Sequence, residues 1–100
     1  MLEKKLEEKF RVAVKQAGGK AYKFTSPGND GVPDRLVILP GGQIGFVELK
    51  QKGKKPTALQ TRRIRELQEK GCKVYVLDNP EDIETVILSI AGITGKDRDL

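Results

Sequence analysis

The stretch RLVILPGGQIGFVELK, residues 35–50, decides the fold of this 100-residue chain. It contains two apolar runs, 35–39 and 44–50, with the turn residues Pro40-Gly41-Gly42-Gln43 between them. Short apolar runs bounded by Gly and Pro are typical of β-strands, and a short Gly-rich connection favours a hairpin. The sequence therefore predicts two antiparallel strands at the centre of the fold.

The segments on either side predict further helices and strands. Before the hairpin, helical apolar spacing up to Gly18-Gly19 predicts a helix over 2–17, followed by a strand over 21–25 and a loop over 26–33. After it come a basic loop over 51–56, a helix that Thr57 opens and that ends before Gly71, a strand over 73–78 and a last helix from Pro80.

The predicted fold class is α/β. The elements form an αβββαβ core with a four-stranded mixed sheet flanked by helices, plus a C-terminal helix. The strand–helix–strand unit at the end predicts that strands 44–50 and 73–78 are parallel. We expect one domain over residues 1–91 and a loose C-terminal tail over 92–100.

Composition excludes several kinds of chemistry. The chain has no His and a single Cys, so catalysis by Ser-His or Cys-His pairs, Cys/His zinc sites and an intramolecular disulfide are all ruled out. It shows no signal-peptide pattern and no apolar run long enough to span a membrane. We expect a cytoplasmic protein.

Positive charge is concentrated in residues 50–73, where nine Lys and Arg face two Glu, whereas the whole chain carries a net charge of +5. A basic loop leading into a basic helix is typical of a surface that binds a phosphate backbone, although an ordinary solvated surface has the same pattern. The candidate DNA contacts are Lys52, Lys54, Lys55, Arg62, Arg63 and, next to the hairpin, Arg35.

Alternation along the second hairpin strand places Glu48 and Lys50 on one face, and Asp34 stands just before the first hairpin strand. Two registers are open. With a five-residue loop over 39–43, Asp34 lies opposite Glu48 and the two Cβ atoms are about 4.5–5.5 Å apart. With a four-residue loop over 40–43, Asp34 lies opposite Leu49 instead.

The first register would bring together two carboxylates and an ammonium group. The carboxylates would repel each other, and a divalent cation with oxygen ligands, Mg²⁺ or Mn²⁺, would remove that cost. The ion would polarise a phosphodiester oxygen, and Lys50 would orient a water or meet charge developing on the phosphate. The alternative is that Asp34 caps a turn while Glu48 and Lys50 form a surface ion pair.

Two further polar side chains are expected to face inward. Glu7 shares a helical line with Phe10 and Val14, so we expect its carboxylate to meet Lys50 or a water on the ion, with Glu3 as the alternative one turn earlier. Gln60 lies one turn before Ile64 and would orient a water or a phosphate, unless it only completes the helix cap.

The combination of Gly31-Val32-Pro33-Asp34, Glu48-Leu49-Lys50 and Gln60 resembles the Pro-Asp…Asp/Glu-x-Lys nuclease superfamily, in particular its VRR-NUC branch, over about residues 2–90. The resemblance implies a restriction-endonuclease-like fold and DNA hydrolysis that depends on Mg²⁺ or Mn²⁺, with the metal held by Asp34, Glu48 and the main-chain carbonyl of Leu49. We accordingly expect association with nucleoid or phage DNA and no organic cofactor. Glu7 would bind the metal directly or through water. Lys50 would be the catalytic lysine, and Gln60 the auxiliary catalytic residue on the helix.

We therefore predict a metal-dependent DNA endonuclease that selects branched DNA, such as a four-way junction, or duplex DNA by structure rather than by sequence. It is expected to be a homodimer, because opposed cuts need two sites. The alternatives are a non-catalytic nucleic-acid-binding module that uses residues 50–73, and a small scaffold domain with incidental basicity. Replacement of Asp34 separates the first alternative from a nuclease, and the salt dependence of DNA binding separates the second.

Overall fold

A computed structural model describes residues 3–93 of the chain. Its elements follow the predicted order: α1 (Glu3–Gln16), β1 (Lys20–Lys23), β2 (Arg35–Leu39), β3 (Gln43–Leu49), α2 (Ala58–Glu69), β4 (Val74–Leu77), the 3₁₀ turn η1 (Pro80–Asp82) and α3 (Ile83–Ile90). Leu2, at the predicted start of the first helix, and residues 94–100 of the predicted tail lie outside the described residues.

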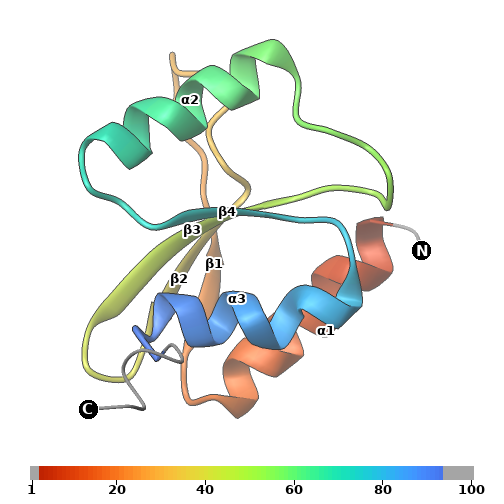
Figure 1. Ribbon diagram of the computed structural model, residues 1–100, viewed down its shortest axis with the longest axis vertical. Coiled ribbons are helices and arrows are strands. Elements are labelled where there is room, and N and C mark those ends of the chain that lie inside the picture. Colours follow the sequence, from red (N-terminus) through yellow and green to blue (C-terminus); the bar gives the residue numbers. More distant parts are fainter. Residues whose placement is uncertain (1–2, 94–100) are drawn as a thin grey trace.

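The four strands form one mixed sheet in the order β1-β2-β3-β4. The β1–β2 and β2–β3 pairs are antiparallel, and the β3–β4 pair is parallel. Helix α2 covers one face of this sheet, and α1 and α3 together cover the other (Figure 1). The predicted hairpin, the parallel pair and the α/β class are therefore confirmed.

Most element boundaries within the described residues agree with the prediction to within one residue, and two differ by more. Strand β1 ends at Lys23, two residues early. Pro80 opens a 3₁₀ turn rather than the last helix, because the side chain of Asn79 accepts a hydrogen bond from the backbone N–H of Glu81 and the chain becomes α-helical only at Ile83. Within residues 3–93, no helix combines the length and the apolar character that a membrane crossing requires.

The hydrophobic core lies between the sheet and the α1–α3 layer. Leu6, Phe10 and Val14 from α1 and Ile90 from α3 are almost completely buried against strand residues such as Val47. These helix positions recur every three or four residues, which is the pattern that buries one helical face. The core therefore fixes α1 and α3 on one side of the sheet and leaves the other side to α2.

Gly45 of β3 allows α3 to approach the sheet closely. A Cβ atom at this position would lie 2.6 Å from Cγ1 of Ile90, which is too short for real atoms. We expect Gly45→Ala to lower the free energy of unfolding by about 1–3 kcal/mol, because the buried methyl group forces α3 away from the sheet.

Urea denaturation checks this prediction, with Gln43→Ala as the control because Gln43 is exposed on the same strand. A Gly45→Ala protein as stable as the control would contradict the close packing of α3.

Candidate active site

The register of the β2–β3 hairpin is the one that brings Asp34 to Glu48. Ile38 pairs with Ile44 and Leu39 pairs with Gln43, so only Pro40, Gly41 and Gly42 form the connection. The connection is shorter than either predicted loop because both glycines adopt positive φ, at 85° and 76°, which favours glycine over other residues.

Asp34 lies immediately before β2 and reaches the end of β3. Its Oδ2 accepts a hydrogen bond of 3.0 Å from the backbone N–H of Leu49. This bond holds the carboxylate next to the Glu48-Leu49-Lys50 segment, which comes from a strand on the other side of the turn. The two segments that the sequence singled out therefore meet at one end of the hairpin.

Glu48 is a buried carboxylate, with only 1% of its surface exposed. Its Oε2 accepts a hydrogen bond of 2.9 Å from Nε2 of Gln60 and lies 3.4 Å from Nζ of Lys50. Burial, and secondarily the nearby charge of Asp34, raise the pKa of Glu48 from 4.5 to about 7, although Lys50 acts in the opposite direction. Glu48 is thus a carboxylate that the fold makes costly to ionise.

The other oxygen of Glu48, Oε1, is buried and has no hydrogen-bond partner. A buried acceptor without a partner destabilises the folded state, and a cation beside it would remove that cost. Within residues 3–93, no cluster of three or more His, Cys, Asp or Glu side chains could enclose a metal ion. Mg²⁺ commonly binds through one or two carboxylates and completes its shell with water and substrate phosphate, so Asp34 and Glu48 fit such an ion.

Gln60 completes the helix cap, which is one of the two roles that the sequence left open, and it also contacts Glu48. It is the third residue of α2, and its Oε1 accepts from the backbone N–H of Thr57 at 2.9 Å, while its own backbone N–H donates to Oγ1 of Thr57 at 3.1 Å. This reciprocal cap uses the amide oxygen and leaves the amide nitrogen to donate to Glu48. The helix cap therefore orients Gln60 within the site.

Glu7 does not contact Lys50, which was one of the two partners that the sequence offered for it. Its Oε1 forms an ion pair with Nη2 of Arg35, a residue whose Nη1 also donates to the carbonyl of Ala21. Arg35 shares the α1 face of the sheet with the buried Val37, and it pairs with Val47 of β3. Glu48 follows Val47 along β3 and therefore occupies the opposite face. Glu7 therefore meets Arg35 rather than Lys50, although it lines a cavity of about 260 Å³ together with Glu3 and Asp34.

The structure does not expose Arg35 for the expected DNA contact, because Arg35 is only 6% exposed and its guanidinium group bonds within the protein. A signal for this was present in the sequence. Arg35 occupies the same strand face as Val37 and Leu39, and a basic residue on a core face needs an internal acceptor.

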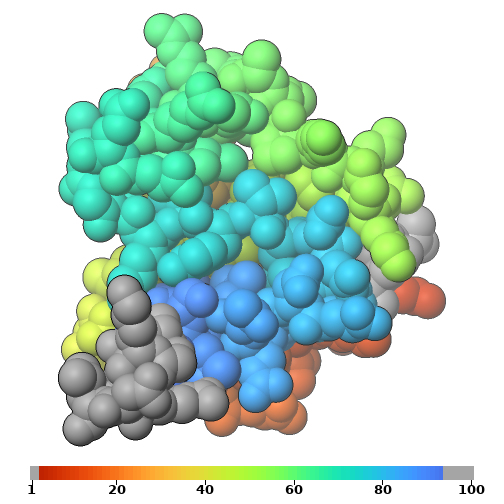
Figure 2. Space-filling view, viewed as in Figure 1, coloured from red at the N-terminus to blue at the C-terminus, as the bar shows by residue number. Residues whose placement is uncertain are grey.

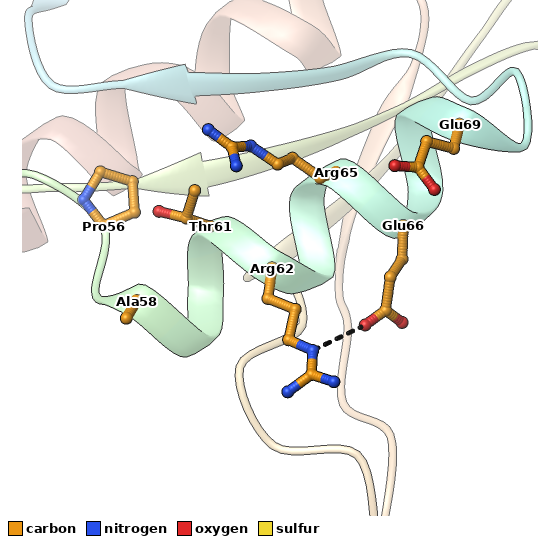
Figure 3. A pocket seen from close by; sticks show the side chains of 7 residues that line it. All are labelled: Pro56, Ala58, Thr61, Arg62, Arg65, Glu66 and Glu69. Carbon is orange, nitrogen blue, oxygen red and sulfur yellow. Dashed lines mark ion pairs between the residues drawn. The ribbon is translucent and has the colours of Figure 1, made fainter.

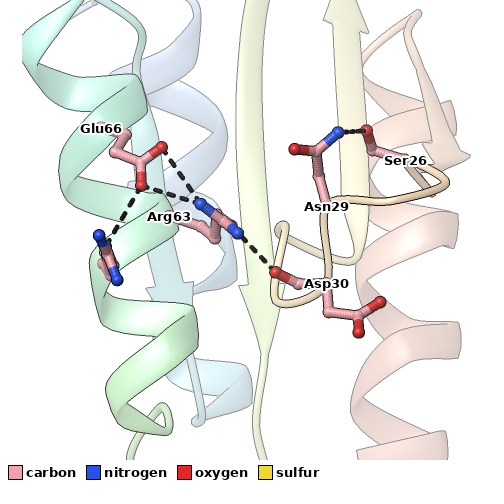
Figure 4. Close-up of polar contacts among 6 residues, drawn as sticks. Ser26, Asn29, Asp30, Arg63 and Glu66 are labelled. Atoms are coloured by element: carbon pink, nitrogen blue, oxygen red, sulfur yellow. Dashed lines mark hydrogen bonds and ion pairs between the residues drawn. The ribbon is translucent and has the colours of Figure 1, made fainter.

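The remaining candidate DNA contacts surround α2. Lys52, Lys54 and Lys55 are exposed, and in Figure 2 the segment that carries them forms a continuous surface with α2. The side chain of Arg62 is 76% exposed and borders an open cavity of about 590 Å³ with Arg65 and Glu66 (Figure 3). Arg63 differs from them, because it bonds to Glu66 and to the carbonyl of Asp30 (Figure 4).

A mixed four-stranded sheet that places a Pro-Asp loop beside a Glu-x-Lys strand end defines a domain of the restriction-endonuclease-like class. A search of protein-family models finds no match for this chain. It is 46% identical over 88 residues to the protein described as "Putative nuclease p44" from Acyrthosiphon pisum secondary endosymbiont phage 1, and the match covers 88% of this chain and 94% of that protein. A solved structure described as a VRR_NUC domain superposes with a TM-score of 0.80 and 31% identity, covering 85% of this chain and 92% of the other.

The chain belongs to the VRR-NUC nuclease family. The resemblance found in the sequence is thereby confirmed, together with the fold that it implied.

Proposed function

We propose that this protein is a DNA endonuclease that depends on Mg²⁺ or Mn²⁺ and selects branched DNA by its structure. The observation that carries the proposal is the buried, unpartnered Oε1 of Glu48 at the point where Asp34 and Lys50 converge. A carboxylate pair that is costly to ionise in isolation, with an ammonium group beside it, suits a hard cation and a phosphodiester. The similarity to the phage protein described as "Putative nuclease p44" supports a nuclease activity.

Asp34, Glu48 and the main-chain carbonyl of Leu49 would hold the metal, which would supply positive charge to polarise the scissile phosphate and to lower the pKa of a water. Asp34 is already held by the Leu49 N–H and needs no large movement to serve as a ligand. Lys50, whose Nζ lies 3.4 Å from Glu48, would turn from that carboxylate toward the negative charge that develops on the phosphate. Gln60 would hold Oε2 of Glu48 through its amide nitrogen and so keep Oε1 directed at the metal.

Glu7 would join this ligand set through Oε2, because Oε1 is paired with Arg35. We propose it as an auxiliary ligand, direct or through water, that substrate or metal recruits. Because a 100-residue chain covers little DNA and opposed cuts need two sites, we further propose that the active form is a homodimer.

The proposed activity is tested by incubating the protein with flaps, duplexes, single strands and four-way junctions, with and without Mg²⁺. We expect cleavage only with the metal, and faster cleavage of branched DNA than of single strands. Absence of cleavage on every substrate in Mg²⁺ and in Mn²⁺ would instead favour a module that binds nucleic acid through its exposed basic loop.

The lysines of that loop should control the salt dependence of DNA binding. We expect the triple variant Lys52→Ala, Lys54→Ala, Lys55→Ala to reduce the slope of log K against log salt by about 3, since each phosphate contact contributes about one unit. Fluorescence anisotropy between 50 and 200 mM salt, about a fourfold range, measures this slope.

Lys4→Ala, Lys5→Ala, Lys9→Ala is the matched control, because these three lysines are exposed on α1 and their replacement removes the same charge. If both triple variants lower the slope equally, the binding reflects the overall charge of the protein rather than a surface at residues 52–55.

A further inference from the structure

Arg63 of α2 is held between two groups of the protein. Its Nε donates to the carbonyl oxygen of Asp30 at 3.0 Å, and its Nη1 donates to Oε1 of Glu66 at 3.0 Å (Figure 4). Its side chain is 26% exposed, compared with 76% for the neighbouring Arg62. The guanidinium group of Arg63 is therefore engaged within the protein, whereas that of Arg62 faces solvent.

The acceptor of Arg63 belongs to the loop of residues 26–31, which leads to Asp34. This loop has its own internal closure, since Nδ2 of Asn29 donates to Oγ of Ser26 at 3.0 Å and the backbone N–H of Asn29 donates to the carbonyl of Ser26 at 2.9 Å. The carbonyl of Asp30 comes just after this closed turn. The hydrogen bond from Arg63 to this carbonyl therefore holds the whole turn against α2.

A second contact fastens the same loop to α2. Gly31, at φ +87°, lies so close to Leu59 that a Cβ atom there would be 2.9 Å from Cγ of Leu59 and 3.3 Å from its backbone carbon. Only Val32 and the buried Pro33 separate Gly31 from Asp34. The position of Asp34 is thus coupled to α2 through a short segment with little freedom.

Helix α2 therefore contacts both segments that carry the site carboxylates. Gln60 bonds to Glu48, and Arg63, three residues later on the same side of the helix, bonds to the loop before Asp34. We propose that Arg63 is a positioning residue, which holds the 26–31 loop against α2 so that Asp34 stays beside Glu48, and that it does not contact a DNA phosphate. This inference rests on the proposed nuclease function.

Loss of Arg63 should therefore impair turnover rather than binding. A displacement of about 1 Å in a reacting group can cost about 10²-fold in rate. We expect Arg63→Ala to lower kcat at saturating DNA by roughly 10- to 100-fold, within that same limit, while the Kd for DNA changes by less than about 3-fold. Arg62→Ala, by contrast, should raise the Kd, because the side chain of Arg62 is 76% exposed and its ion pair with Glu66, at 3.8 Å, leaves it accessible to phosphate.

The experiment measures kcat, Kd and amide hydrogen exchange of residues 26–33 in the wild type, Arg63→Lys and Arg63→Ala. A lysine can still donate one hydrogen bond to the carbonyl of Asp30, so Arg63→Lys should be intermediate in both loop protection and kcat. Arg11→Ala is the charge-matched control, because Arg11 is exposed on α1, and it should match the wild type in all three measurements.

We expect kcat to fall, from wild type to Arg63→Lys to Arg63→Ala, in the same order as amide exchange in residues 26–33 becomes faster. A variant that exchanges faster in residues 26–33 but keeps the wild-type kcat would overturn the proposal, and so would a loss of activity that appears entirely as weaker DNA binding. If Arg63→Ala does not fold, Arg63→Lys provides the same comparison with the wild type. If the wild type itself does not cleave DNA, the proposed function fails, whereas hydrogen exchange still reports whether Arg63 holds the loop.

Discussion

Asp34→Asn is expected to abolish measurable Mg²⁺-dependent cleavage, with a loss of at least about 10³-fold. A divalent ion that polarises a phosphoryl oxygen supplies several kcal/mol of transition-state stabilisation. Each 1.36 kcal/mol corresponds to a factor of about ten in rate, so loss of the ion removes about three powers of ten. The asparagine lacks the negative charge that Mg²⁺ requires but keeps an oxygen that can accept from the Leu49 N–H, so the fold should be retained.

The same variant should bind DNA at least as tightly as the wild type, because one negative charge is removed beside the phosphate backbone. Cleavage rates at saturating DNA and a binding titration in Ca²⁺ separate the two effects. Glu84→Gln serves as the control, since it removes one negative charge from an exposed position on α3. An Asp34→Asn protein that cuts DNA at the wild-type rate would refute the proposed metal site.

Glu48→Gln should abolish cleavage and, in the absence of metal, stabilise the protein at neutral and higher pH. The pKa of Glu48 is about 7 in the folded protein and 4.5 when unperturbed. Between these values the folded state binds more protons than the unfolded state, so the stability of the wild type falls as the pH rises through this range. This difference between the two pKa values corresponds to a loss of about 3 kcal/mol at most in the free energy of unfolding.

Glutamine has no charge at any pH in this range, and its variant should not show this fall in stability. Urea denaturation at pH 5 and pH 8 is the direct test: the two proteins should be similar at pH 5, and Glu48→Gln should be the more stable at pH 8. Mg²⁺ should then stabilise the wild type at pH 8 but not the variant, because the ion offsets the buried charge. If Glu48→Gln is less stable than the wild type at pH 8 without metal, burial of an unpartnered carboxylate is not the dominant feature of this position.

The effects of Glu48→Gln on cleavage and on stability have one cause. The fold holds Glu48 in a place where its ionised form is unfavourable without a cation, and this same placement prepares the carboxylate for a cation. Stability without metal is reduced, and the ligand needs no rearrangement when the metal arrives. A functional site that is destabilising in isolation is common in enzymes.

The sequence alone was sufficient to predict the features that depend on neighbouring residues. The helical period of Leu6, Phe10 and Val14, the apolar runs of the two hairpin strands and the Thr57–Gln60 cap are local patterns, and the structure contains all of them. The Pro-Asp and Glu-x-Lys motifs are also short and local, and they were enough to indicate the family.

Tertiary structure decided which side chains meet across the fold. Two hairpin registers were compatible with the sequence, and the backbone of Gly41 and Gly42 selected the one that joins Asp34 to the end of β3. The partners of Glu7 and Arg63 also depend on residues 28 and 33 positions away. Periodicity in the sequence shows which side of a helix or strand is buried. Hydrogen bonds and ion pairs, however, act over only a few ångströms. The partner of a buried charge is therefore set by the packing of elements that are distant in the chain.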